Sequence, residues 1–550
     1  MQTLFKRLYQ LITIQLFILI GLTPQPLLAN NSLELVFTYG SEKENWITEV
    51  TRTFNQSHFK TTAGKVIQVT AIPMGSGEAI QELLEGQRQA HLCSPASAAF
   101  IELANAESID QGKNQLIGPT QSLVRSPVVI AMWKPMAEAL GWGKQPIGWA
   151  EILNMANHPD GWAAYDYPEW GKFKFGHTHP KFSNSGLISL LAEVYAGSGK
   201  TKNLTAADVN NSDVRHYVET IEKSVVHYGR STGFFGDKMF TFGPEFLSAA
   251  VSYENLVIES YDSKYQLPFP IVAIYPQEGT FWSDHPIGVV EREWVTKQHQ
   301  QAAKVYIDYL LAKTQQQKAI RYGFRPADKG IPLTTPLDEQ HGVNPNEPTT
   351  LLEVPPAYII REILTLWNER KKHTNVVLVL DISGSMMGDK LNHARQGALE
   401  FLAALGEADT FSLLIFNNQI NWLAKQLPLK TKRQLIEKKI KTLFARGNTA
   451  LYDAITEAHQ YLKNNVQAEK IAAIVVLSDG QDTSSQIQLE ELLKQIPLSE
   501  TTPILIFPIG YGEDADQTVL AKIANETKTK VYQGTIQDIE KVFLEISTFF

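Results

Sequence analysis

The stretch VVLVLDISGSM, residues 376–386, decides the fold of the C-terminal part of the chain. Apolar residues rich in valine run directly into an acid, two serines and a glycine. Such a run is typical of a strand buried on both faces of a parallel sheet, and it delivers its last residues to the carboxyl edge, where α/β proteins bind ligands. The oxygen atoms of Asp381, Ser383 and Ser385 predict a site for Mg²⁺, Mn²⁺ or Ca²⁺ there.

The segment that follows alternates strands with helices. Apolar runs at 410–416, 471–477 and 503–509 predict buried strands, and the pattern of 539–550 predicts a closing amphipathic helix. This alternation is typical of a doubly wound, mainly parallel sheet with helices on both faces. We therefore expect an α/β domain over residues 373–550.

Three short motifs fall at strand ends and helix starts of this domain. They are Asp381-Ile382-Ser383-Gly384-Ser385, Gly447-Asn448-Thr449 and Ser478-Asp479-Gly480. In this order they resemble the motifs of von Willebrand factor A (VWA) domains, which have a Rossmann-like fold. The resemblance implies a metal-ion-dependent adhesion site (MIDAS). Ser383, Ser385 and Thr449 would ligate the ion through their hydroxyls, and Asp381 and Asp479 would act directly or through bound water.

The resemblance also implies a kind of partner. Mg²⁺ is the expected ion, with Mn²⁺ or Ca²⁺ as alternatives, and an ion held partly by neutral hydroxyls keeps residual positive charge. An Asp or Glu of another protein can then replace a water and complete the coordination shell. The alternative is an intact-looking site without an ion, in which the serines only cap helices.

The N-terminus has the features of an export signal. Lys6 and Arg7 precede a mainly apolar run at 11–22, and a small residue, Ala29, stands at a plausible cleavage point. We expect residues 1–29 to be a signal peptide and the protein to be exported to the periplasm or cell surface. An uncleaved membrane anchor is the alternative. The single cysteine excludes an intrachain disulfide, and the net charge of -8 argues against nucleic-acid binding.

Residues 30–325 also alternate strands and helices, including one long amphipathic helix expected over 302–320. Short motifs there resemble periplasmic solute-binding proteins of the molybdate- and sulfate-type class: Gly75-Ser76-Gly77, Ser94-Pro95-Ala96-Ser97, Ser126-Pro127-Val128, Ser183-Asn184-Ser185-Gly186 and Tyr275-Pro276-Gln277-Glu278-Gly279-Thr280. The resemblance implies two α/β lobes with a ligand in the cleft between them. Because this class has oxyanion-binding members, it also implies an oxyanion as one class of ligand. The candidate ligand contacts are Ser76, Ser97, Ser126, Ser185 and Thr280. The alternative is that these residues only cap helices and shape loops.

A proline-rich segment separates the two domains. Seven prolines fall within residues 326–356, which disfavours both helices and central strands. A helix with an apolar face is expected over 357–370. Residues 326–372 are therefore interpreted as a linker that ends in a connecting helix.

Other patterns are given structural roles. His177 and His179 alternate on an expected strand, but no acid or histidine lies nearby at ligand spacing. The basic stretch 430–443 is interleaved with apolar residues and predicts an amphipathic helix with a solvated basic face. Gly197-Ser198-Gly199-Lys200-Thr201 lacks the first glycine and the strand that a phosphate-binding loop requires.

Together these features predict an exported, non-enzymatic binding protein. No nucleophile-elbow motif, zinc-protease helix motif or complete phosphate-binding loop is found in the sequence. The alternative function is an accessory substrate-binding component of an ABC-type transport system. A role in metal insertion, in which related A domains take part, conflicts with the export signal because that machinery is usually cytoplasmic.

Overall fold

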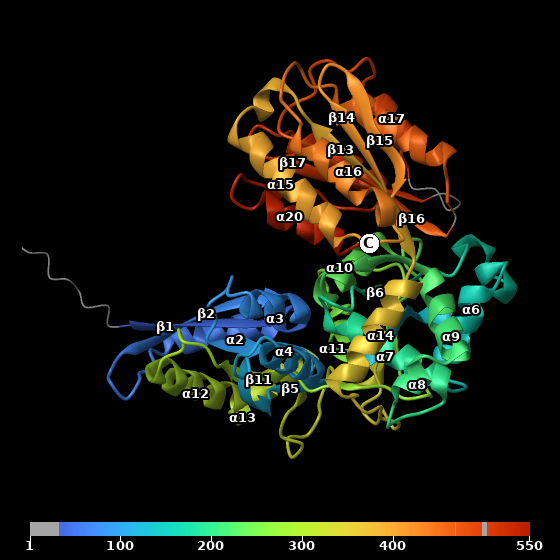
Figure 1. Ribbon diagram of the computed structural model, residues 1–550. Coiled ribbons are helices and arrows are strands. Elements are labelled where there is room, and N and C mark those ends of the chain that lie inside the picture. The colour runs from blue at the N-terminus through green and yellow to red at the C-terminus, as the bar shows by residue number, and fades with distance from the viewer. Residues whose placement is uncertain (1–31, 468, 498–502) are drawn as a thin grey trace, which may run out of the picture.

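The computed structural model describes residues 32–467, 469–497 and 503–550, so the expected signal peptide lies outside the described residues. The described chain forms three sheets, two in the N-terminal domain and one in the C-terminal domain. Figure 1 shows the two N-terminal lobes side by side, with the C-terminal domain above them and close to the second lobe. Among the described residues, no helix has the length and apolar character needed to cross a membrane.

The first lobe is built on a five-stranded sheet of order β2-β1-β3-β11-β4. β1 runs parallel to β2 and β3, whereas β11 is antiparallel to both of its neighbours. Trp46 and Val50 of α2 pack with Tyr306 of α12 on one face. The strands are β1 (Ser32–Gly40), β2 (Val66–Met74), β3 (Leu92–Ser94), β4 (Ile117–Ser122) and β11 (Pro286–Val290), and the helices are α2 (Glu44–Gln56), α3 (Ser76–Leu84), α4 (Ala98–Asp110), α12 (Lys297–Leu311) and α13 (Lys313–Arg321).

The expectation of one helix over 302–320 was wrong. The chain forms two helices, α12 and α13, which are separated at Ala312, where ψ is 140°. The break lets the side-chain amide of Gln316 donate to the carbonyl oxygens of Leu123 (3.0 Å) and Leu310 (3.1 Å). The second of these bonds satisfies a carbonyl near the end of α12, which the broken helix would otherwise leave without a partner.

The second lobe surrounds β5, which pairs with β8, β9, β10 and β12. The chain passes between the lobes three times, after β4, after β10 and after α13. Leu123 N–H donates to His285 O (3.2 Å) where the first two crossings meet. The strands are β5 (Val124–Trp133), β6 (Phe175–Thr178), β7 (Val225–Gly229), β8 (Ala249–Tyr253), β9 (Ile271–Ile274), β10 (Trp282–Ser283) and β12 (Arg325–Pro326), and the helices are α5 (Lys134–Ala139), α6 (Trp149–Asn157), α7 (Asn184–Ser198), α8 (Ala206–Val209), α9 (Ser212–Lys223), α10 (Thr232–Phe242) and α11 (Glu254–Glu259).

The linker lies along the second lobe. Leu352 N–H donates to Thr280 O (2.9 Å), and Ala273 N–H donates to Gly342 O (2.8 Å). Helix α14 (Ala357–Arg370) follows, and it buries Trp367 completely. This helix leads directly into the first strand of the C-terminal domain (Figure 1).

The C-terminal domain has a six-stranded sheet of order β15-β14-β13-β16-β17-β18. All neighbouring strands are parallel except β14 and β15, which are antiparallel. The sequence analysis did not predict the edge strand β15. The strands are β13 (His373–Asp381), β14 (Thr410–Phe416), β15 (Ile420–Pro428), β16 (Lys470–Ser478), β17 (Ile504–Tyr511) and β18 (Tyr532–Gly534), and the helices are α15 (Asp389–Ala404), α16 (Leu429–Lys441), α17 (Leu451–Asn464), α18 (Leu489–Gln495), α19 (Gln517–Glu526) and α20 (Ile539–Ser547).

The apolar run of β13 is buried on both faces. Val376 and Leu378 belong to the core cluster that includes Phe401 of α15, whereas Val377 belongs to the cluster that includes Leu451 of α17. Alternate residues of a strand point to opposite faces, so the run fills both layers of the domain. This arrangement fixes β13 at the centre of the sheet and its last residue at the carboxyl edge.

Candidate functional site

The predicted metal ligands gather where β13 and β16 end. These strands are adjacent and parallel, with Leu380 opposite Leu477, so the residues that follow lie side by side at one edge. Asp381 and Asp479 are both fully buried. The local geometry therefore brings together two acids that are far apart in the sequence.

Serine hydroxyls link these acids. Ser385 Oγ donates to Asp479 Oδ1 (2.7 Å) and lies 3.0 Å from Ser383 Oγ. The backbone N–H of Ser383 donates to Asp381 Oδ1 (2.8 Å), and Ser478 Oγ donates to Asp381 Oδ2 (2.8 Å). Four of the five predicted ligands are thus connected through hydrogen bonds, and Ser478 is an additional contact that the sequence analysis did not single out.

The fifth predicted ligand, Thr449, lies in the adjoining loop and is 5% exposed. Gly384 N–H donates to Gly447 O (2.8 Å), which fastens this loop to the one that holds the serines. The loop is itself fixed, because the carbonyl of Thr449 accepts hydrogen bonds from the N–H groups of Thr483 (2.8 Å) and Ser484 (3.0 Å). Gly447 has a φ of +82°, a conformation that favours glycine.

The five candidate solute contacts are buried, and each is already bonded to protein. Ser97 and Ser185 lie at the starts of α4 and α7. Ser97 Oγ donates to Asn184 Oδ1 (2.5 Å), and Ser185 Oγ lies 2.8 Å from Thr178 Oγ1. The other three hold backbone: Ser76 Oγ accepts from Ala96 N–H (3.0 Å), Ser126 Oγ accepts from Asn255 N–H (3.3 Å), and Thr280 Oγ1 donates to Val128 O (2.6 Å).

A cleft of about 680 Å³ lies between the lobes and reaches the C-terminal domain. None of the five candidate contacts lines it, although Gly75, next to Ser76, does. Arg230 projects into it and pairs with Glu78 of α3 and with Glu545 of α20, the latter at 2.7 Å. Arg230 is therefore a cation shared by both lobes and the C-terminal domain.

Residues 35–325, just over half of the chain, match the family model of bacterial extracellular solute-binding proteins. The chain belongs to this family. Residues 375–543 match the von Willebrand factor type A domain, so a VWA domain follows the solute-binding domain. The predicted fold class is confirmed, and both families are of the binding or adhesion type.

Similar proteins and structures cover separate parts of the chain. The inter-alpha-trypsin inhibitor heavy chain H2 of Sus scrofa is 28% identical over 186 residues, and heavy chain H4 of Bos taurus is 30% identical over 159 residues. These matches cover 32% and 28% of this chain but only 20% and 17% of the relatives.

Among solved structures, the periplasmic binding protein P5PA is 12% identical, with a TM-score of 0.42 and coverage of 62% of this chain and 99% of that chain. A von Willebrand factor type A structure from Catenulispora acidiphila is 20% identical, with a TM-score of 0.29 and coverage of 32% and 43%.

The VWA domain concentrates negative charge at its candidate site. Burial, with a smaller contribution from the nearby carboxylate of Asp479, raises the pKa of Asp381 to about 6 against the hydrogen bonds from Ser383 and Ser478. Lys390 of α15 places its ammonium nitrogen 2.7 Å from Asp479 Oδ2. Sequence reasoning missed Lys390, although its position just after the serine motif, at the start of a helix, was a usable signal.

The donor set fits a hard cation. Carboxylate and hydroxyl oxygens surround the edge of the sheet, and the described site contains no thiol or imidazole among its bonded partners. Two buried carboxylates share only the charge of Lys390, so a divalent ion would relieve their mutual repulsion. This arrangement can hold an ion and present it to a ligand.

Proposed function

We propose that the protein is an exported, non-enzymatic binding protein whose VWA domain holds a divalent cation, Mg²⁺ before Mn²⁺ or Ca²⁺. The proposed ligands are the hydroxyls of Ser383, Ser385 and Thr449, with Asp381 and Asp479 bound directly or through water. The observation that carries the proposal is the buried pair of acids, joined through serines at the carboxyl edge of the sheet.

The cation would serve as a contact for a protein partner. Neutral hydroxyls leave much of its charge uncompensated, and hard cations keep exchangeable waters. An Asp or Glu side chain from the partner would replace one of these waters. This mode of binding requires no catalytic residue in the site.

For the solute-binding domain we propose a small solute, with oxyanions as the first class to test. Ser76, Ser97, Ser126, Ser185 and Thr280 remain its candidate contacts, and their bonds to protein would have to exchange for bonds to the ligand. Support comes from the family match and from the helix starts at Ser97 and Ser185, since helix N-termini attract anions. The second candidate is a domain that only serves as a scaffold.

The family match also supports an alternative role as an accessory substrate-binding component of an ABC-type transport system. The two roles differ in what the VWA domain contributes. Delivery of a solute to a membrane permease needs only the two lobes, whereas the adhesion role needs the cation.

Calorimetric titration of the full chain with Mg²⁺ and Mn²⁺ tests the cation site. We expect binding by the native chain and none by Asp381→Ala, with an unchanged circular dichroism spectrum for the variant. Absence of heat and of a thermal shift at saturating ion would contradict the proposal. A thermal-shift screen of oxyanions, amino acids and sugars tests the first domain, and no stabilisation by any of them would favour the scaffold role.

A further inference from the structure

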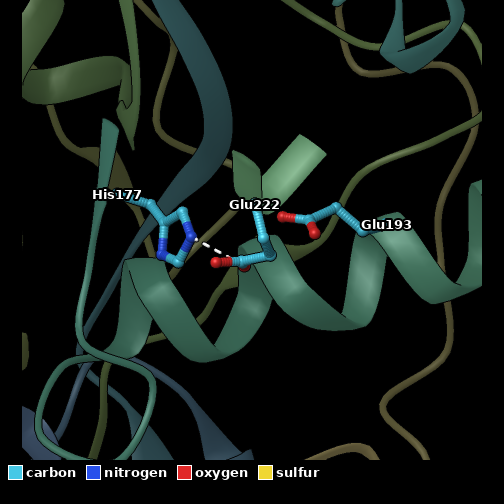
Figure 2. A group of neighbouring side chains, drawn as sticks. All are labelled: His177, Glu193 and Glu222. Atoms are coloured by element: carbon cyan, nitrogen blue, oxygen red, sulfur yellow. Dashed lines mark hydrogen bonds and ion pairs between the residues drawn. The ribbon is translucent and has the colours of Figure 1, made fainter. Parts of the chain in front are cut away.

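Three metal-ligating side chains meet inside the second lobe, away from the VWA domain's candidate site. They are His177 of β6, Glu193 of α7 and Glu222 of α9, and all three are fully buried. One ligand atom from each lies within 4.8 Å of the other two, and His177 Nε2 is 3.0 Å from Glu222 Oε1. Figure 2 shows the imidazole and both carboxyl groups pointing toward one another. The structural role expected for His177 therefore does not account for its surroundings.

Outer contacts hold two of these groups in a defined orientation. His177 Nδ1 lies 2.8 Å from the carbonyl oxygen of Thr178, which can only accept, so this nitrogen carries the hydrogen. With the hydrogen on Nδ1, Nε2 is the ring nitrogen that faces the cluster and is available to a metal ion, as in metal-binding histidines. The hydroxyl of Tyr228 donates to Glu222 Oε2 (2.6 Å), which leaves Glu222 Oε1 facing the histidine.

Glu193 has one oxygen without a protein partner. Ser189 Oγ donates to its Oε1 (2.9 Å), whereas Oε2 is buried and has no hydrogen-bond partner among the described residues. A buried polar atom in this state is costly, and a native structure rarely keeps one without a reason. The unpartnered oxygen belongs to the cluster.

The charges are also unbalanced. Two carboxyl groups lie in the interior beside one imidazole, and the buried ammonium of Lys371 acts on Glu222 through its charge without forming an ion pair with it in the described chain. Burial raises the pKa of Glu193 well above its usual value, and the nearby Glu222 raises it further. A proton on Glu193 would reduce the repulsion, but at the present spacing Glu193 Oε2 has no hydrogen-bond partner among the described residues.

We propose that His177, Glu193 and Glu222 bind one divalent transition-metal ion of the Zn²⁺ or Mn²⁺ class. One neutral imidazole and two carboxylates balance the charge of such an ion and give Glu193 Oε2 a partner. A mixed nitrogen and oxygen donor set without thiolate suits these ions better than Mg²⁺ or Ca²⁺. Metal–ligand distances of about 2.0–2.2 Å place two tetrahedral ligand atoms about 3.3 Å apart, close to the present 3.0 Å between His177 Nε2 and Glu222 Oε1, and the carboxyl group of Glu193 would adjust to this spacing.

The position of the cluster gives the ion a structural role. Tyr228, which holds Glu222, stacks edge-on against Trp367 of the connecting helix with ring centroids 5.2 Å apart. The backbone N–H of Tyr228 donates to Phe549 O of the VWA domain (3.4 Å). A bound ion would therefore stiffen the second lobe where it supports the junction between the two domains.

The test uses the full chain with Asp381→Ala, so that the VWA site does not contribute. The chain is produced in zinc-supplemented medium, and a second sample is unfolded, stripped with a chelator and refolded with Zn²⁺ or Co²⁺, because a closed site loads slowly. We expect a stoichiometric ion by mass spectrometry of the metal content and a Co²⁺ absorption spectrum typical of nitrogen and oxygen ligands. We also expect a higher Tm than for the stripped protein.

Glu193→Gln, added to Asp381→Ala, removes one ligand with little change in volume. We expect it to lose the ion and the metal-induced rise in Tm, while the metal-free Tm stays equal or rises because a buried carboxyl is gone. Glu219→Gln on α9 is the matched control and should keep the ion. Loss of stoichiometric metal from every sample, or its retention by Glu193→Gln, would overturn the proposal and leave a proton-sharing network. Neither outcome depends on Mg²⁺ binding by the VWA domain.

Discussion

The substitution Asp381→Asn separates the metal role of this residue from its role in the fold. Asp381 is buried beside Asp479, and its pKa is raised from 3.8 to about 6. Because this pKa is higher in the folded chain than in the unfolded one, the folded chain holds the proton more tightly. The resulting stabilisation is fully present below about pH 4 and is lost as the pH rises through about 6.

The size of the effect follows from this difference. A change of about 2 in pKa corresponds to about 3 kcal/mol, so ionised Asp381 costs the metal-free VWA domain up to that amount at pH 7.5. An asparagine side chain at position 381 carries no charge at any pH in this range. Its amide can accept one of the two hydrogen bonds from Ser383 N–H and Ser478 Oγ, and the mismatch with the other donor costs about 1 kcal/mol. We expect a net gain of about 1–2 kcal/mol at pH 7.5 in chelator.

Hydrogen exchange of peptides from β13 and β16 measures this gain locally, which avoids treating a multidomain chain as one two-state unit. In chelator, the variant should be better protected than the native chain at pH 7.5 and no better protected at pH 4, where Asp381 is protonated in the folded chain and partly protonated in the unfolded one. With saturating Mg²⁺ the order should reverse, since only the native chain gains protection from the ion. A variant that is less protected at both pH values in chelator would refute the claim that the buried charge of Asp381 is costly.

Three further substitutions test particular contacts. Lys390→Met removes an ammonium group 2.7 Å from Asp479 that competes with the metal ion, so Mg²⁺ affinity by titration should rise several-fold, and a fall in affinity would contradict this reading. Arg230→Ala breaks the link between Glu78 and Glu545, so limited proteolysis should release the VWA domain faster. The control Arg88→Ala breaks an ion pair within the first lobe and should not change the rate of release. Trp367→Ala empties a fully buried position in α14, so calorimetry should show that the free energy of unfolding falls by about 3–5 kcal/mol. A loss below about 1 kcal/mol would show that α14 is not packed as described.

The central strand of the VWA domain could be predicted because its signal is local. A run of apolar residues that ends in polar ones determines both burial and direction, and three such ends specify one edge of a sheet. That rule predicts the positions of Asp381 and Asp479 at this edge, whereas the complete ligand set with Thr449 was expected from the resemblance to VWA domains. The edge strand β15 was missed because only one of its residues, Ala424, is buried, so its sequence lacks a continuous apolar run.

Features that depend on tertiary contacts could not be predicted from spacing. The break at Ala312 involves neither glycine nor proline, and one of the bonds that Gln316 makes beside it is to Leu123, which is distant in the sequence. Glu193 and Glu222 lie on two separate helices, α7 and α9, which only the folded chain brings beside His177, so the spacing of ligands along the sequence does not reveal them. Lys390 differs from these cases, because its position just after the serine motif was a signal in the sequence, and its distance to Asp479 identifies its partner.

The contacts between the domains suggest how the two lobes and the VWA domain influence one another. Arg230 lies just after β7, and its two glutamate partners belong to the first lobe and to α20 of the VWA domain. Opening of the cleft would separate Arg230 from Glu78 while leaving Glu545 in place, so the VWA domain would remain with the second lobe. Tyr228, two residues earlier, holds Glu222 and bonds to Phe549. The cleft contact, the contact to the buried cluster and the attachment of the VWA domain therefore all lie on β7 or directly after it, so an ion in the lobe would stabilise the position of the VWA domain through β7.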